Sequence, residues 1–281
     1  MTTMTRLRES FYAIALSVLA GLGAGCFGTR LPTNDDAGYG KGQDLALACN
    51  ANNDGVLERS EIAFPIGATI RYLTNPPGTT VGVEPEGTQT GAGREWDMTS
   101  TAGEVLTLEI EPLADAWFAP SFPSATYATL ADVGSDTLGV FRVTDSELLL
   151  LGFASRTPNQ TLLVYDAPIA TLRFPLKLGD GWVTGARVTN GTLRGQPFAS
   201  TDTYQISVDA KGAVVLPYLR VENVLRVRVN LTQTVPGGVA LTRIQHLFFR
   251  ECTGELGRMV SPLGVTDPAF AEAVEFRRLA L

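Results

Sequence analysis

Short alternating segments separated by turn residues constrain the fold of this chain most strongly. Leu225, Val227, Val229 and Leu231 alternate with polar or charged residues, which is the pattern of a strand with one face in a core. Comparable β-branched or alternating segments, bounded by Gly, Pro or Asn, recur from residue 68 onward. The sequence shows no long amphipathic helical pattern. We therefore expect a mainly β domain over residues 67–281, built as an antiparallel sandwich, an open barrel or a large curved sheet.

The expected strands share this alternation or a run of β-branched residues. They cover residues 68–74, 79–84, 94–99, 104–111, 137–144, 147–154, 161–165, 182–189, 203–208, 223–232, 241–250 and 255–261, before a final segment at 271–281. Turn residues between them predict reversals at Asp145-Ser146, Asn190-Gly191, Lys211-Gly212 and Pro236-Gly237-Gly238.

Residues 50–61 carry oxygen-bearing side chains at the spacing of a twelve-position calcium loop. Gly55 permits the sharp turn at position 6, and Leu57 supplies an apolar anchor between ligand positions. The pattern resembles an EF-hand loop and implies Ca²⁺ held by Asn50, Asn52, Asp54, the Val56 carbonyl, Glu58 and Glu61. Asn50 stands where aspartate is usual, so we expect weak affinity, about 10⁻⁴–10⁻³ M. The alternative is an Asn/Asp/Gly turn that holds no ion.

Short helices are expected on both sides of this loop, within an EF-hand-like segment at residues 43–66. Gln43 to Cys49 is long enough for about two helical turns leading into the loop. Ser60 to Phe64 forms only the stub of a helix after it, because Pro65 cannot continue a helix.

The first 25 residues have the features of an export signal. Arg6 and Arg8 precede an apolar run at residues 11–22, and small residues follow at 23–25. The run is short for a bilayer span, which needs about 20 apolar residues, although an uncleaved membrane anchor is the alternative. Residues 26–42 are polar, contain glycine and lack periodicity, so we expect a flexible tether.

Residues 22–26 (Leu-Gly-Ala-Gly-Cys) resemble the lipobox of bacterial lipoproteins, with Gly23 at the place where leucine is usual. The resemblance implies that Cys26 is acylated and anchors the chain to a membrane. Phe27 follows it in place of the aspartate that retains many lipoproteins at the inner membrane, which implies the outer membrane of a cell envelope. Ordinary cleavage near Ala24, leaving Cys26 as a thiol, is the alternative.

The other two cysteines are Cys49 and Cys252. If Cys26 carries lipid, an even number remains in an oxidising compartment, so we expect Cys49 and Cys252 to pair. That disulfide would tie the calcium-like loop to a late strand. The alternative is two buried free thiols.

Composition and motifs argue against several classes of function. With 29 acidic against 22 basic residues, the chain has a formal charge of −7 and lacks the basic character of nucleic-acid-binding proteins. The single histidine, His246, lies in an apolar segment, and no Gly-x-Ser-x-Gly motif occurs. We therefore expect no enzyme. A hydrolase with paired carboxylates remains an alternative, and its candidates lie in or near strands: Asp97, Glu104, Glu109, Asp166, Asp202 and Glu222.

An aromatic, proline-rich stretch contains Trp117, Phe118 and Phe122. Exposed aromatic patches mark contacts, so this stretch is a candidate binding lip for a polysaccharide, a peptide or a lipid. The alternative is a loop packed over one end of the sheet.

Several short motifs carry a broader resemblance. They are Phe174-Pro175-Leu176, Gly179-Asp180-Gly181-Trp182, Leu216-Pro217 and Val224-Leu225-Arg226-Val227. Together with the signal, the lipobox and the calcium-like loop, they resemble uncharacterised bacterial lipoproteins of myxobacterial type. We expect a lipid-anchored, non-enzymatic cell-envelope protein with a structural calcium loop, facing the periplasm or the outside. The alternative is a carrier or adhesin that binds an apolar or glycan ligand on a curved sheet.

Overall fold

The computed structural model describes Cys49 and residues 51–280. The expected signal segment, Cys26, the tether, residues 43–48 and Asn50 lie outside these described residues. No helix in the described part has the length and apolarity that a membrane crossing requires.

Strands dominate the described chain, as the alternation predicted. They are β1 Val56–Leu57, β2 Thr69–Thr74, β3 Val81–Gly82, β4 Thr88–Thr90, β5 Gly93–Asp97, β6 Glu104–Glu109, β7 Tyr127–Leu130, β8 Thr137–Val143, β9 Glu147–Ser155, β10 Leu162–Arg173, β11 Leu176–Lys177, β12 Gly181–Leu193, β13 Gln196–Leu216, β14 Leu219–Thr234, β15 Leu241–Arg250, β16 Gly254–Val260, β17 Glu272–Ala273 and β18 Glu275–Leu279. Two 3₁₀ turns, η1 Arg59–Glu61 and η2 Ala119–Ser121, are the helical elements among these residues.

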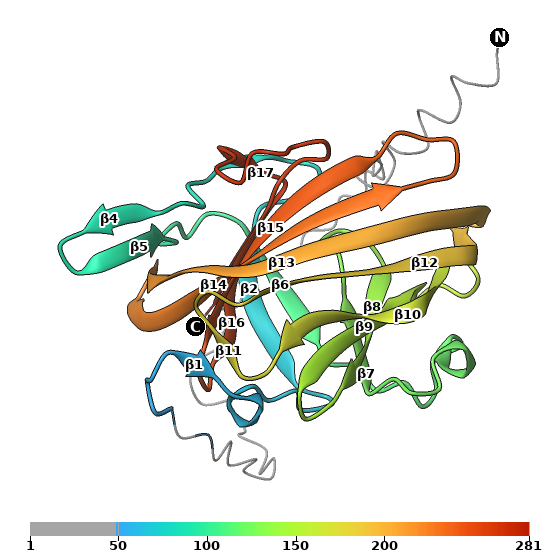
Figure 1. Cartoon of the computed structure of the whole chain (residues 1–281), viewed down its shortest axis with the longest axis horizontal. Coiled ribbons are helices and arrows are strands. Elements are labelled where there is room, and N and C mark those ends of the chain that lie inside the picture. The colour runs from blue at the N-terminus through green and yellow to red at the C-terminus, as the bar shows by residue number, and fades with distance from the viewer. Residues whose placement is uncertain (1–48, 50, 281) are drawn as a thin grey trace, which may run out of the picture. The chain divides into compact units, whose positions relative to one another are not determined.

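One large sheet follows the order β6-β2-β18-β16-β15-β14-β13-β12-β10-β9-β8-β7. All neighbours on this path pair antiparallel. Just beyond β6, Glu111 forms an isolated antiparallel bridge with Ala128 of β7, so the sheet is nearly closed and barrel-like. The hairpin of β4 and β5 joins from outside this path, where β5 runs parallel to β13 (Figure 1).

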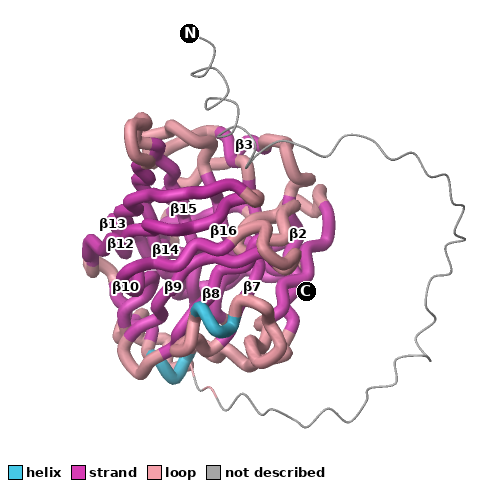
Figure 2. Tube along the Cα trace, turned by 90° about the vertical axis from the view of Figure 1, so that its right-hand side faces the viewer, coloured by secondary structure: helices cyan, strands magenta, loops and turns pink. Residues whose placement is uncertain are grey.

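The nearly closed sheet has an inner face with one core and an outer face with two cores. On β9, Leu148 and Leu150 pack in the inner core, whereas Leu149 and Leu151 pack in an outer core, as alternation along a strand requires. The second outer core centres on Trp96 and Phe248. Figure 2 shows the strands stacked side by side, with β12 to β16 on one side and β7 to β10 below them.

The predicted turns have mixed outcomes. The reversals at Asp145-Ser146 and Pro236-Gly237-Gly238 are confirmed, because they join β8 to β9 and β14 to β15. The turns predicted at Asn190-Gly191 and Lys211-Gly212 are wrong, because both pairs lie inside the long strands β12 and β13. Register shifts between Val188 and Gly191, and between Gly212 and Val214, show that these glycines lie at β-bulges, where an extra residue bends the strand.

The helix-loop-helix expected around residues 50–61 needs correction. After the loop the chain forms β1 and then only the three-residue 3₁₀ turn η1. β1 pairs antiparallel with β11, which fixes Val56 and Leu57 in an extended conformation. The helix predicted after the loop is therefore wrong: the chain there forms a short strand and a 3₁₀ turn.

Candidate functional site in the 49–62 loop and the inner sheet face

The segment from residue 51 to residue 56 contains tight turns, each closed by a hydrogen bond from a backbone N–H to an Asn or Asp side chain. The Asp54 backbone N–H donates to Asn52 Oδ1 at 3.0 Å, and the Val56 N–H donates to Asp54 Oδ1 at 2.7 Å. Such Asx turns are the usual reason for Asn and Asp in loops. Gly55 has a φ of +81° and lies beneath the Lys211 side chain, so glycine alone fits there without strain.

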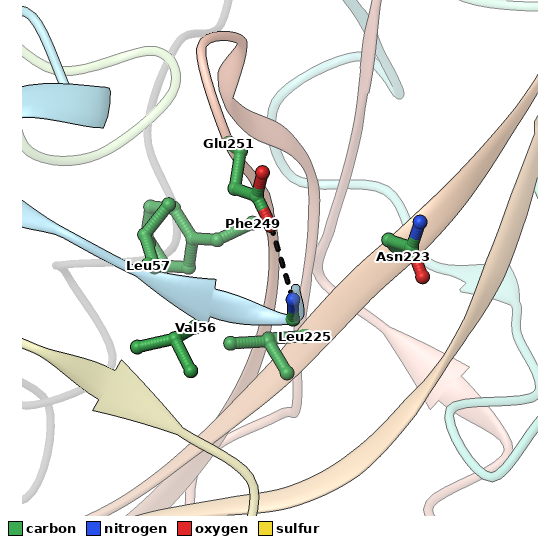
Figure 3. Close-up of a pocket in the computed structure, with 7 residues that line it drawn as sticks. Val56, Leu57, Asn223, Leu225, Phe249 and Glu251 are labelled. Atoms are coloured by element: carbon green, nitrogen blue, oxygen red, sulfur yellow. Dashed lines mark hydrogen bonds between the residues drawn. The ribbon is translucent and has the colours of Figure 1, made fainter. Parts of the chain in front are cut away.

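A carboxylate from far along the chain binds the loop. Glu251, in the turn between β15 and β16, accepts hydrogen bonds from the backbone N–H groups of Asn53 at 2.7 Å and Gly55 at 3.2 Å. The Glu251 side chain is buried, at 3% exposure. Figure 3 shows Glu251 directed at the loop, in a place that Leu57, Leu225 and Phe249 also line.

A disulfide joins the loop to the same turn. Cys49 and Cys252 are bonded, with their Cα atoms 5.5 Å apart, so the predicted pairing is present in the structure. The Cys252 N–H also donates to the Glu61 carbonyl at 2.9 Å. The turn between β15 and β16 therefore holds both ends of the 49–62 loop.

Apolar side chains of the loop extend the inner core. Leu57 and Ile62 are 1% and 3% exposed and pack with Leu176 and Phe249. The apolar anchor predicted at Leu57 is thus buried against the sheet. We call the described residues of the range 49–62 the plug, because Leu57 and Ile62 cover the inner core at the end of the sheet where β15 turns into β16.

The predicted calcium ligands do not converge within the described part of the loop. Asn52 and Asp54 are exposed and hydrogen-bonded to each other at 2.8 Å. Glu61 instead is buried and accepts the Glu58 N–H at 2.9 Å, as a cap of η1. Nowhere in the described residues do three His, Cys, Asp or Glu side chains come together as a metal site. A calcium ion needs six or more oxygens around one point, and Asn50, the first of the predicted ligands, lies outside the described residues.

The aromatic stretch is a cover and offers no exposed lip. Phe118 and Phe122 are 3% and 4% exposed and pack in the outer core over β7, β8 and β9. Trp117 is partly buried, and its Nε1–H donates to the Ser155 carbonyl at 2.8 Å. All three residues therefore fit the alternative interpretation, a loop packed over the sheet. Their rings cover apolar side chains on the outer face of the strands.

His246 is fully buried beside the outer core that centres on Trp96 and Phe248. Its Nε2 is 2.8 Å from the Pro268 carbonyl, and the Phe270 ring lies 5.5 Å away. Burial lowers the pKa of His246 to about 4, and the nearby Arg226 adds to this effect. The imidazole is therefore neutral at pH 7, and it packs as part of the core.

The candidate carboxylates are spread over the sheet and bind non-acidic groups. Asp97 accepts from Thr99, Asp166 from the Arg187 N–H, and Glu222 from Arg220. Glu104 and Glu109 are exposed on β6. Asp202 alone among them is buried, at 3% exposure. The other five are exposed, and no hydrogen bond of the described residues links two of the six.

Asp202 belongs to a polar cluster on the inner face. Asp202 Oδ2 accepts the Tyr165 hydroxyl at 2.6 Å, and Oδ1 accepts Gln233 Nε2–H at 3.1 Å. The Tyr204 hydroxyl lies 3.2 Å from that of Tyr165. Burial raises the pKa of both tyrosines, so their hydroxyls stay protonated. The predicted strand at 203–208 excluded Asp202, although its two-residue spacing from Tyr204 was the available signal that the two share a face.

The inner face between this cluster and the plug carries a row of partly buried apolar side chains, beside which Arg243 and Gln245 of β15 pair with Leu231 and Val229. These apolar side chains retain solvent-accessible surface although they pack against the inner core: Phe141, Phe153, Leu163, Val229, Leu231 and Leu247. On β14 they lie in a row, since Gln233, Leu231, Val229 and Leu225 are inner-face positions that run from the Asp202 cluster to the plug.

Comparison with protein-family models, with curated proteins and with solved structures found no match for this chain, so its function is inferred from its own geometry.

Proposed function

We propose that this chain is a lipid-anchored, non-enzymatic cell-envelope protein that binds a small apolar or amphiphilic ligand on the inner face of its nearly closed sheet. The observation that carries the proposal is the row of partly buried apolar side chains between the plug and the Asp202 cluster. A site lined mainly by apolar and aromatic groups, with a few polar groups at one end, is the usual form of a small-molecule site.

The disulfide supports the location. Disulfides persist in oxidising compartments such as the bacterial periplasm, and Cys49–Cys252 joins segments far apart in the chain. The lipid anchor rests on the lipobox-like residues 22–26. Labelling of the expressed full chain with palmitate tests it: Cys26→Ser should abolish incorporation, and label retained by this variant would exclude an anchor at Cys26.

Binding is tested with a neutral, apolar fluorescent probe such as N-phenyl-1-naphthylamine, whose emission rises when it leaves water. Val229→Phe adds volume to the inner face and should weaken binding about tenfold, because a bulky ring occupies the ligand's place. Val183→Phe is the matched control, since Val183 is 66% exposed on β12 and its side chain lies on the outer face.

The outcomes separate cleanly. Binding by the natural chain that Val229→Phe weakens and Val183→Phe leaves intact supports the proposal, provided that both variants keep the natural melting temperature. Absence of binding by the natural chain would refute it. Equal loss in both variants would place the probe elsewhere and refute the inner-face site.

A further inference from the structure

We infer that the Asp202 cluster recognises a cationic head group, an amine or ammonium, on a ligand whose apolar tail runs along the inner face toward the plug. The inference rests on the proposed function and names the class of ligand for that site. Its three parts are the charge of Asp202, the aromatic rings beside it and the apolar row that leads away from it.

The charge of Asp202 lacks a basic partner among the described residues. Its two oxygens accept hydrogen bonds from Tyr165 and Gln233, which are both neutral donors. The nearest basic residue on this face, Arg243 of β15, pairs with Leu231 in the sheet and forms its ion pair with Asp132, at 3.8 Å. Buried carboxylates are normally paired with a cation, because a charge removed from water is costly. A ligand cation would supply the missing partner.

One tyrosine hydroxyl contacts this carboxylate, and two more aromatic side chains lie next to that tyrosine. Tyr165 and Tyr204 contact it or each other through their hydroxyls, and the Phe153 ring meets Tyr165 edge to face at 6.1 Å. The faces of aromatic rings attract cations, and several rings around one point recognise ammonium groups. A carboxylate together with tyrosine rings therefore favours a cationic group over a neutral or an anionic one.

The apolar row gives the ligand's tail its direction. Leu231 pairs with Tyr204, and Val229 pairs with Ile206 one step closer to the plug. Both leucine and valine side chains are partly buried. An alkyl tail laid along Leu231 and Val229 would remove this remaining apolar surface from water, which stabilises a complex in proportion to the area buried.

The test compares three probes with the same twelve-carbon tail: dodecyltrimethylammonium, dodecyl maltoside and dodecyl sulfate. Each displaces N-phenyl-1-naphthylamine from the full chain, below its micelle-forming concentration. We expect the cationic probe to bind about tenfold or more tightly than the neutral one, and the anionic probe to bind most weakly.

Asp202→Asn removes the charge and keeps the shape, and Gln233 can flip its amide to match the new side chain. We expect this variant to bind the cationic and neutral probes equally. Asp145→Asn makes the same change in charge at the exposed turn between β8 and β9 and should keep the natural preference. Tyr204→Phe serves as a second variant, because it removes only a hydroxyl and should reduce the cationic preference less than Asp202→Asn does.

Three results would overturn the inference. Equal binding of the cationic and neutral probes by the natural chain leaves the apolar site standing and removes the head-group assignment. A preference that survives in Asp202→Asn, with the melting transition intact, places the cation elsewhere. Failure of all three probes to displace the dye refutes both the inference and the proposed function.

Discussion

The carboxylate of Glu251 accepts a hydrogen bond from the backbone N–H of Gly55 at 3.2 Å, although the two residues lie 196 positions apart. The same carboxylate binds the Asn53 N–H. A buried carboxylate of the protein thus accepts hydrogen bonds from two backbone N–H groups of the loop. Glu251 therefore holds the loop for which the sequence predicts an ion.

Replacement of Glu251 should therefore destabilise the fold. Glu251→Ala leaves two backbone donors without a partner, and hydrogen bonds to a charged group contribute about 1.5–3 kcal/mol each. We expect the free energy of unfolding in urea to fall by at least about 2 kcal/mol. Glu104→Ala is the control, since Glu104 is exposed at the start of β6. Equal effects of the two substitutions would show that Glu251 adds nothing to the plug.

Calcium should leave the thermal midpoint of the chain unchanged. A ligand that binds only the folded state raises stability by mass action, and the described loop residues lack converging ligands. The measurement is a melt in millimolar calcium and a second melt in chelator. A rise in calcium that Glu61→Gln abolishes would instead establish the EF-hand-like site predicted from the sequence.

Loss of the disulfide should lower stability substantially. Cys49 and Cys252 are separated by 203 positions, and closing so long a loop is worth about 5 kcal/mol on the chain-entropy model, with 2–5 kcal/mol typical of measured losses. The Cys49→Ser/Cys252→Ser double variant should unfold at lower urea than the natural chain. Adding a reductant should shift the natural chain toward the variant and leave the variant itself unmoved. Coincident transitions of the two proteins without reductant would contradict a stabilising role.

Acid should destabilise the outer core through His246. Its pKa is about 4 in the folded chain and 6.5 in the unfolded one, so between these values the unfolded state binds one more proton. Stability is then full above pH 6.5 and falls as the pH drops toward 4, by about 1.4 kcal/mol per pH unit. His246→Gln keeps a donor for the Pro268 carbonyl and does not titrate. The pH slope of its unfolding free energy should be smaller by this amount, and an unchanged slope would exclude His246 as the cause.

The sequence predicted what depends on local patterns. Alternation at residues 225–231 identified β14 and its inner face, and spacing identified Leu57 as an apolar anchor. Patterns that depend on distant partners were out of reach. A strand pairing of Val56 with Lys177 and a 3₁₀ turn stand where a helix was expected. The cover formed by Phe118 and Phe122 depends on strands that follow them in the chain.

In the candidate site, too, the sequence predicted some residues and gave no sign of others. The pairing of Cys49 with Cys252 followed from counting cysteines, and it is present in the structure. Nothing in the sequence pointed to Glu251. Its carboxylate reaches the N–H groups of the plug only because the chain turns toward the plug after β15. Asp202 was one of six candidate carboxylates, and only its burial beside Tyr165 and Gln233 separates it from the others.

The strand order has a consequence for how the chain is made. β2 pairs with β18 through Leu73 and Arg278, so an early strand and a late one are neighbours in the sheet. While synthesis proceeds, β2 lacks this partner until residues 275–279 have emerged from the ribosome. Pairings between segments so far apart form slowly. Such a delay keeps the nascent polypeptide open for longer, so that an early strand waits unpaired on this edge until the last strand has been made.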